Sequence, residues 1–335
     1  MESSLLALAL HLKKGVGYAF YRKVLKECGS LVACYEEGRL GLTEAELDRG
    51  RRELEKAEKL KVRIITVEDP DYPQELLYVA QPPLAIYVKG KLLPAPRVAV
   101  VGSRRCSSYG RRVAYSLGKC LSSAGVTVVS GLAQGIDAEG HRGALEGEGK
   151  TLAVLGSGVD SVFPLSNLDL ARRIVEEGGG LISEFPLGTK ARKEHFPRRN
   201  RIVSGLSKAV VVVEAPERSG SFITVNYALD QGKEVFAVPG PVDSPFSKGS
   251  NRLILEGATP LLECEQLLEL FGAELQPFAV PEEFKELYAL LSGGPKSPDR
   301  LAQELGVPVT EVLCKLSLME VKGLVRREGG VFSLC

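Results

Sequence analysis

The alternation of apolar and polar positions divides the chain into four parts. In residues 1–60, leucines and valines recur at helical spacing, and Gly15-Val16-Gly17 separates two of these stretches. This pattern predicts a small helical domain. The glycine-containing segment is similar to a helix-hairpin-helix turn, although an ordinary structural turn explains it equally simply. Residues 61–96 contain short β-like runs interrupted by prolines, a pattern typical of edge strands and connectors.

Residues 97–262 alternate strand-like and helix-like segments. The strand-like segments are 97–102, 126–131, 151–156, 180–185, 209–215 and 234–240. They are almost continuous runs of apolar residues, which indicates strands buried on both faces, as in a parallel sheet covered by helices. We therefore predict an α/β fold whose core is a Rossmann-like parallel sheet, in a domain spanning residues 61–262.

Residues 282–335 predict a separate domain. Helical segments there are followed by a β-hairpin over Gly329-Gly330, which is the order of a winged helix-turn-helix. Residues 263–281 would form the linker. The helix expected within residues 310–323 carries two Lys and two Glu, so its charge cancels and favours contact with protein over reading of duplex DNA.

Composition narrows the possible functions. The formal net charge is +1, so a site for a polyanion must come from local segregation of charge. The seven cysteines include no C-x-x-C pair, which favours free thiols in a reducing compartment over disulfides or a zinc site. Neither a leader sequence nor an apolar run long enough to cross a membrane is present, so we expect a cytoplasmic protein without a membrane partner.

The loops that follow the strands hold the candidate chemistry, because ligands of open parallel sheets bind at the carboxyl ends of the strands. These loops contain Ser103, Arg104, Arg105, Gly131, Gly135, Gly156, Gly158, Phe163, Asn167, Ser219, Gly220 and Ser221. A further basic loop, residues 190–201, carries six Lys or Arg, one Glu and Phe196. Glycines allow close approach, arginines suit phosphates, and phenylalanines offer faces for bases. This combination predicts a nucleotide or a single strand of nucleic acid as the ligand.

Several classes of enzyme do not fit these loops. The segment RVAVVGSRRCSSYG lacks the G-x-G-x-x-G of dinucleotide sites, and the chain has only three histidines and no H-E-x-x-H or G-x-S-x-G motif. We therefore predict no cofactor, no metal and no catalytic residue. One enzymatic alternative stays open. SGSFITVNYAL is similar to the loop and helix of nucleoside-monophosphate phosphoribohydrolases, the lysine-decarboxylase-like fold, with Glu214 as the acidic residue.

The motifs, taken in order, resemble the DNA-processing protein A family (DprA/Smf) over residues 97–258. They are VAVVGSRRCSSYG, VVSGLAQGIDAEGHRGAL, TLAVLGSGVDSVFP, LISEFPLGT, HFPRRNRIVSGLS, VVVVEAPERSGSFITVNYALDQGKEVFAVPG and SKGSNRLILEGA. The resemblance implies an extended Rossmann domain that binds single-stranded DNA without catalysis. It also implies a sterile-alpha-motif-like N-terminal domain and a C-terminal winged helix.

The resemblance further implies a biological role and a set of binding residues. Members protect incoming strands during natural transformation, help to load the RecA recombinase and act as homodimers. Carried onto this sequence, the binding pocket would use Ser103, Arg104, Gly131, Gly135, Gly156, Gly158, Lys193, Phe196, Arg199, Asn200 and Arg201. The chain departs from many relatives at Leu165, which follows Phe163-Pro164 where those relatives carry a basic residue.

Overall fold

The computed structural model describes residues 2–148, 151–272, 282–291, 293–321 and 324–334. The chain forms two compact units, Met1–Leu275 and Gln276–Cys335. Within the described residues, no helix is long and apolar enough to cross a membrane.

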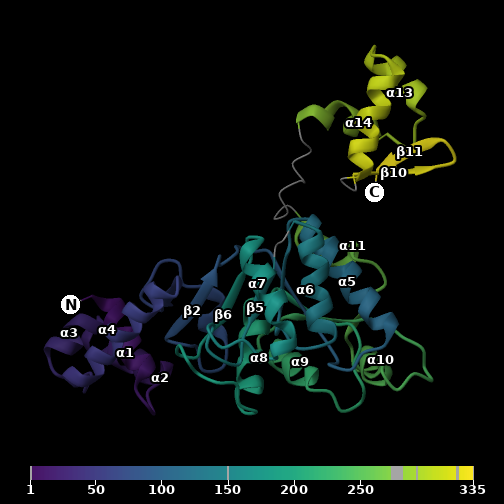
Figure 1. The fold of residues 1–335 in the computed structure, drawn as a ribbon. Coiled ribbons are helices and arrows are strands. Elements are labelled where there is room, and N and C mark those ends of the chain that lie inside the picture. The colour runs from purple at the N-terminus through teal and green to yellow at the C-terminus, as the bar shows by residue number, and fades with distance from the viewer. Residues whose placement is uncertain (1, 149–150, 273–281, 292, 322–323, 335) are drawn as a thin grey trace. The chain divides into compact units, whose positions relative to one another are not determined.

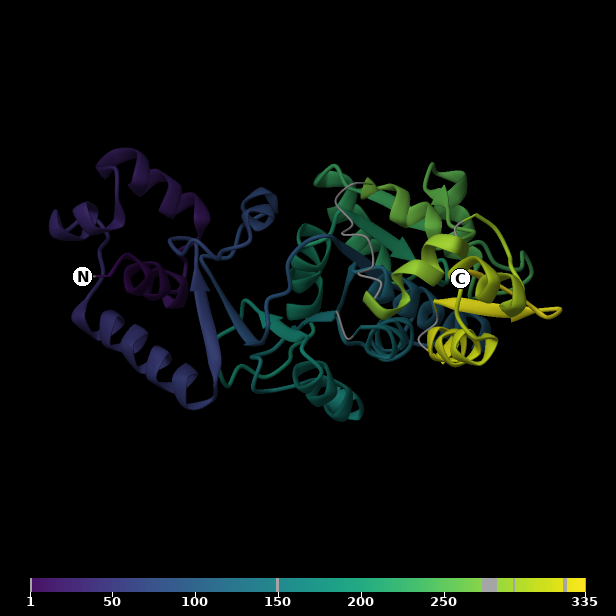
Figure 2. The same cartoon turned by 90° about the horizontal axis from the view of Figure 1, so that it is seen from above.

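Four helices form the N-terminal part of the first unit. They are α1 (Ser3–Leu12), α2 (Tyr18–Cys28), α3 (Leu31–Glu36) and α4 (Glu44–Lys59). The side chain of Thr43 accepts a hydrogen bond from the backbone N–H of Glu46, and the Glu46 carboxylate accepts one from the backbone N–H of Thr43, which starts α4 with a capping box. Helix α1 is almost completely buried, because α3 and α4 pack on it and it contacts the first two strands of the sheet. Figure 2 shows these helices beside those strands.

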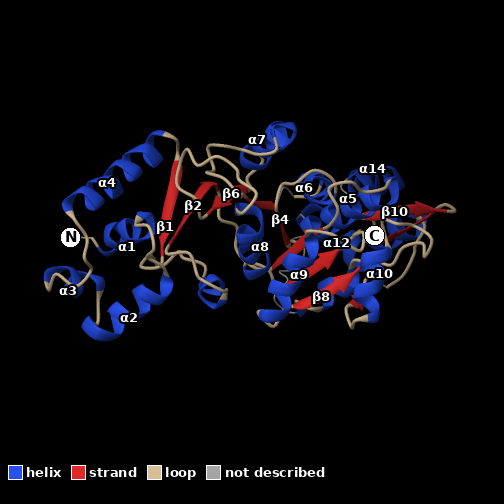
Figure 3. Cartoon of the chain, turned by 90° about the horizontal axis from the view of Figure 1, so that it is seen from below, coloured by secondary structure: helices blue, strands red, loops and turns tan. Residues whose placement is uncertain are grey.

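The described strands of the first unit form one sheet, drawn in red in Figure 3. They are β1 (Val62–Thr66), β2 (Ala85–Gly90), β3 (Arg97–Val101), β4 (Thr127–Ser130), β5 (Thr151–Val154), β6 (Gly180–Ser183), β7 (Ala209–Val212), β8 (Glu234–Ala237) and β9 (Thr259–Pro260). Their order is β1-β2-β6-β5-β4-β3-β7-β8-β9. The β1–β2 and β2–β6 pairs are antiparallel, whereas the other neighbours are parallel. The order of the strands therefore reverses between β3 and β7, which makes a topological switch point there.

Helices cover both faces of this sheet (Figure 1). One face carries α5 (Ser108–Ser123), α6 (Ile136–Glu146) and α7 (Leu168–Glu176), and the other carries α8 (His195–Gly205), α9 (Ser221–Asp230) and α10 (Lys248–Leu255). In β3, Val98 and Val100 pack with α5 and α6, while Ala99 and Val101 pack with α8 and α9. Because both sets of side chains are buried, the strand is apolar from Val98 to Val101. The predicted α/β fold with a Rossmann-like parallel sheet is confirmed.

The second unit has the predicted elements of a winged helix. They are α12 (Lys285–Leu291), α13 (Pro298–Leu305), α14 (Val309–Val321), β10 (Val325–Glu328) and β11 (Val331–Leu334). The hairpin turns at Gly329 and Gly330, whose φ angles of 55° and 88° are those that a two-residue turn of type I′ needs. The segment expected to be a linker, 263–281, contains α11 (Glu265–Glu269), and its residues 273–281 lie outside the described part of the chain.

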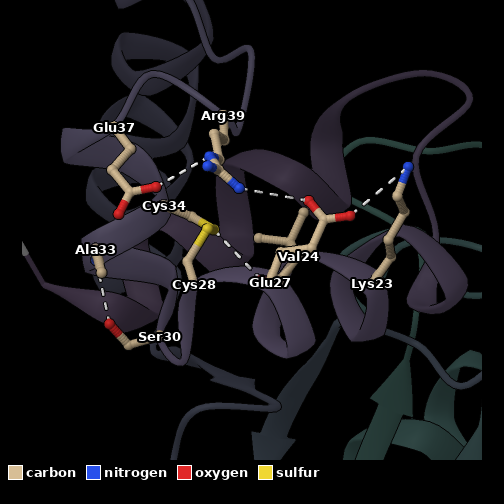
Figure 4. Close-up of a disulfide and its surroundings, with 9 residues drawn as sticks. All are labelled: Lys23, Val24, Glu27, Cys28, Ser30, Ala33, Cys34, Glu37 and Arg39. Carbon is tan, nitrogen blue, oxygen red and sulfur yellow. Dashed lines mark hydrogen bonds and ion pairs between the residues drawn. A yellow bond between two sulfur atoms is a disulfide. The ribbon is translucent and has the colours of Figure 1, made fainter.

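The expectation that the cysteines are free thiols is wrong for four of them. Disulfides join Cys28 to Cys34 and Cys120 to Cys264, with Cα atoms 5.4 and 6.6 Å apart. Figure 4 shows the first pair, at the end of α2, and Arg39 close by. The sequence gives no signal for either pair, because separations of 6 and 144 residues match no spacing motif and only the fold brings the sulfur atoms together.

A count of reactive thiols tests this pairing. We expect no more than three of the seven cysteines to react with a thiol reagent when the protein is denatured without reductant, since four are held in disulfides. All seven should react after reduction. In the matched Cys120→Ser/Cys264→Ser variant the number that reacts without reductant should not change. Seven reactive thiols in the unreduced protein would contradict the pairing.

Candidate functional site

A cavity of about 760 Å³ opens at the switch point of the sheet. Its walls come from the loops after β3, β4 and β7, from α8, and from the loop before α10. The cavity brings together eleven of the residues proposed from the sequence, namely Ser103, Arg104, Arg105, Gly131, Lys193, Phe196, Arg199, Asn200, Ser219, Gly220 and Ser221. This is the position at which open α/β sheets bind their ligands.

The basic segment that we expected to be a loop lies outside any helix over residues 190–194, whereas its residues 195–201 form the first part of helix α8. The prediction of a loop is wrong for residues 195–201. Pro197 is compatible with the helix because it lies in the first turn, where its missing N–H breaks no hydrogen bond. The helical period then sorts the side chains. Arg199 and Asn200 follow Phe196 by three and four residues, and all three line the cavity. Arg198 and Arg201 contact Glu184 instead.

Arg199 is buried in the floor of the cavity and ties α8 to the sheet. Its Nη1 donates hydrogen bonds to the carbonyl oxygens of Gly131, at 2.7 Å, and Val154. Burial lowers the pKa of Arg199 to about 10, so it remains a cation at neutral pH. Beside it, Asp137 accepts hydrogen bonds from the backbone N–H groups of Gly131 and Ala133. Burial raises the pKa of Asp137, although the charge of Arg199 opposes that change.

Phe196 offers an aromatic face that its neighbours hold in place. The guanidinium carbon of Arg104 lies 5.3 Å from the centre of the ring, and the ring of Phe163 is 5.8 Å away and tilted by 46°. Gly156 lies against the ring, because a Cβ atom there would come within 3.0 Å of Phe196 Cδ1. Phe163 does not line the cavity but lies at its margin, and its side chain is 48% exposed.

The mouth of the cavity is positively charged. Arg104, Arg105, Lys193 and Arg218 are exposed and line it, and none of them forms an ion pair with a carboxylate in the described part of the chain. Nearby, the Ser219 and Ser221 hydroxyl groups are 2.7 Å apart at the start of α9. Unpaired cations beside an aromatic face suit a polyanion with unpaired bases.

The other proposed residues lie outside the lining of the cavity. Gly135, with φ of 80°, is the N-cap of α6, and a Cβ atom there would collide with the carbonyl oxygen of Ser103. The Asn167 side chain donates to the carbonyl oxygen of Leu132 at 2.9 Å. The backbone N–H of Gly158 donates to Thr189 at 2.9 Å. Gly135 and Asn167 thus support the loops after β3 and β4, whereas Gly158 supports the loop after β5.

Arg201, the last of the proposed residues, is buried behind α8. Its Nη2 lies 2.7 Å from Glu184 Oε2, and Arg198 contacts the same oxygen at 2.7 Å. Burial lowers the pKa of Arg201. The backbone carbonyl of Glu184 also contacts the ring of His11 in α1 at 2.8 Å. Glu184 therefore joins α8, β6 and the N-terminal helices.

Several residues that line the cavity were missed by sequence reasoning, among them Asp137, Arg218, Pro245 and Phe246. Arg218 lies in the loop between β7 and α9, so the rule that ligands bind at strand ends could have found it. Pro245 and Phe246 come from the loop before α10, which has no glycine-rich or basic pattern. Among the residues that the structure describes, no group of His, Cys, Asp or Glu has an arrangement that could hold a metal ion.

Comparisons with known proteins agree with this architecture. A family model described as DNA recombination-mediator protein A matches residues 63–272, and a DprA winged helix domain matches residues 272–331. Protein Smf of Escherichia coli is 42% identical over 278 residues, covering 78% of this chain and 74% of the relative. DNA processing protein DprA of Bacillus subtilis is 39% identical over 211 residues, covering 62% of this chain and 71% of the relative.

Two solved structures are also similar. DprA of Streptococcus pneumoniae has a TM-score of 0.67 and 32% identity, covering 82% of this chain and 99% of that one. DNA processing protein A of Helicobacter pylori has a TM-score of 0.57 and 26% identity, covering 64% of this chain and 98% of that one, and is described as having a unique single-stranded DNA binding mode.

Proposed function

The chain belongs to the DprA/Smf family of DNA-processing proteins, and on that basis we propose that it binds single-stranded DNA without sequence preference and without catalysing a reaction. The observation that carries this proposal is the group of unpaired cations around a fixed aromatic ring at the switch point of the sheet. The description of the Helicobacter pylori relative as a single-strand binder supports it.

In this proposal each part of the cavity has a role. Arg104, Arg105, Lys193 and Arg218 neutralise phosphates, and Phe196 stacks a base. Ser103, Gly131, Asn200 and the segment Ser219-Gly220-Ser221 complete the walls with hydrogen-bonding groups. Arg199, Arg201 and the supporting residues Gly135, Gly156, Gly158, Phe163 and Asn167 position these groups. Stacking is favourable for every base, so little sequence preference is expected.

We further propose the cellular role that the family resemblance implies. The protein would protect incoming single strands and help to load RecA during natural transformation, acting as a homodimer in the cytoplasm. The positively charged cavity supports the first step, because a strand held there by its phosphates is less accessible to nucleases.

The enzymatic alternative has weaker support. A phosphoribohydrolase of the lysine-decarboxylase-like fold would need Glu214 at the substrate, but Glu214 is only 1% exposed and does not line the cavity. Its carboxylate instead accepts hydrogen bonds from the N–H and hydroxyl groups of Ser107, at 2.7 and 2.6 Å, at the start of α5. Release of adenine from AMP by the purified protein would favour this alternative.

Salt dependence tests the proposed function. If four cations neutralise phosphates, log K for an oligothymidylate should fall by about 2.8 per tenfold rise in salt, at about 0.7 per contact. Between ~50 and ~200 mM salt this is a loss of roughly fifty-fold in affinity, measurable by fluorescence anisotropy.

Substitution of single arginines tests which of them contact phosphates. Arg218→Gln should reduce the slope by about 0.7. Arg172→Gln is the matched control, because Arg172 is exposed on α7 and paired with Asp169 at 3.2 Å, so the slope should not change. Binding that does not depend on salt, or no binding at low salt, would contradict the proposed function.

A further inference from the structure

Phe246 presents a second aromatic ring to the same cavity. It lies in the loop between β8 and α10, lines the cavity, and is 37% exposed. Phe196 has the guanidinium of Arg104 and the ring of Phe163 as neighbours. In contrast, Phe246 has no aromatic or cationic partner within the described ranges of the chain. The ring is therefore not used in a contact that would explain it as part of the core.

The loop that carries Phe246 is anchored on both sides. The Asn251 side chain accepts from the backbone N–H of Gly240 at 3.0 Å and donates to its carbonyl at 2.9 Å. The backbone N–H of Gly249 donates to the carbonyl of Ala215, beyond β7, at 2.8 Å. These bonds tie the loop to the ends of β7 and β8, so the backbone on both sides of Phe246 is anchored. An anchored loop loses less entropy than a free one when its side chain stacks a base.

The chemistry around Phe246 suits a nucleotide. An exposed aromatic ring can stack on any base, and the stacking contributes favourable binding free energy. Arg218 lines the same cavity without a carboxylate partner and is available to a phosphate. Phe196 and Phe246 belong to different walls, α8 and the loop before α10, so the cavity offers two separate aromatic faces to a strand.

We propose that Phe246 forms a second stacking subsite, so that the cavity engages two bases of one DNA strand. This inference rests on the proposed function. It adds a subsite that binds an unpaired nucleobase by stacking, without hydrogen bonds that would distinguish one base from another.

The test compares variants of Phe246 on the shortest oligothymidylate that reaches full affinity. Because the ring is partly covered, Phe246→Ala should weaken binding by about 5- to 30-fold, the lower part of the range for one stacked base. Phe246→Tyr should keep the affinity of the original protein, and Phe246→Leu should not. Val242→Ala, an exposed residue of the same loop, is the control and should bind normally. Unchanged thermal midpoints would show that the variants fold.

Abasic substitution identifies the base that contacts the ring. Each nucleotide of the oligomer is replaced in turn by an abasic unit, and the original protein is compared with Phe246→Ala. At one position the two proteins should bind equally, because the base that the ring stacks is already absent, and Phe196→Ala should show the same behaviour at a different position. Equal affinity of Phe246→Ala and the original protein for the intact strand would overturn the inference, as would full rescue by Phe246→Leu. A failure of the original protein to bind would instead contradict the proposed function.

Discussion

Replacing Glu184 by Gln is expected to lower the free energy of unfolding by about 3–5 kcal/mol, the usual cost of breaking a buried ion pair by removing one partner. The Glu184 side chain is 1% exposed and that of Arg201 is 3% exposed, so the substitution leaves a buried guanidinium without a counter-charge. Arg198 is half-exposed and can turn to solvent. Urea denaturation at neutral pH, followed by circular dichroism, measures the loss.

A double variant distinguishes loss of the charge pair from loss of packing. In Glu184→Leu/Arg201→Met both buried charges are removed and the volume is kept, so at least half of the lost stability should return. The single variant should also weaken binding of DNA, because the pair fixes α8, which carries Phe196 and Asn200 at the cavity. A loss of unfolding free energy below about 1 kcal/mol would contradict this expectation, because it would mean that the Glu184–Arg201 pair is no stronger than an ion pair on the surface.

The sheet could be predicted from the sequence because its signal is local. The strands are short apolar runs, and residues 98–101 of β3 are each buried against one of two helical layers. The apolar composition of the segment therefore indicates that the strand lies inside the sheet. Part of the site could also be predicted from the sequence. The carboxyl ends of parallel strands lie at one edge of a sheet, so the loops that carry Ser103, Gly131 and Ser219 were expected to lie close together, as they do.

The parts that could not be predicted depend on tertiary structure. A run of arginines in a sequence reveals its charge but not the direction in which each side chain points. Because α8 is a helix, Arg199 points to the cavity whereas Arg201 points away from it, to Glu184. Phe246 was missed for a similar reason. Its loop reaches the cavity through the bonds of Asn251 and Gly249 to the strand ends, and no spacing in the sequence records those contacts.

Arg104 and Phe196 should act on the same nucleotide, and a double-mutant cycle on binding can show this. Arg104→Ala removes a charge-assisted contact and Phe196→Ala removes a stacking face, and each should weaken binding of an oligothymidylate by about 1–3 kcal/mol. Because the guanidinium lies 5.3 Å from the centre of the ring, each residue also orients the other. The double variant should therefore lose at least about 0.5 kcal/mol less than the sum of the two single losses, a difference of roughly two-fold or more in affinity.

The controls for this cycle use residues of the same types away from the cavity. Tyr78 is 83% exposed and Arg172 lies on α7, so Tyr78→Ala and Arg172→Ala should leave affinity within the error of the anisotropy measurement. Strict additivity of Arg104→Ala and Phe196→Ala would mean that the two residues contact separate nucleotides, since independent contacts contribute independently. In that case the cation over the ring would be a feature of the unbound protein alone, and Arg104 would move away from Phe196 to reach its phosphate.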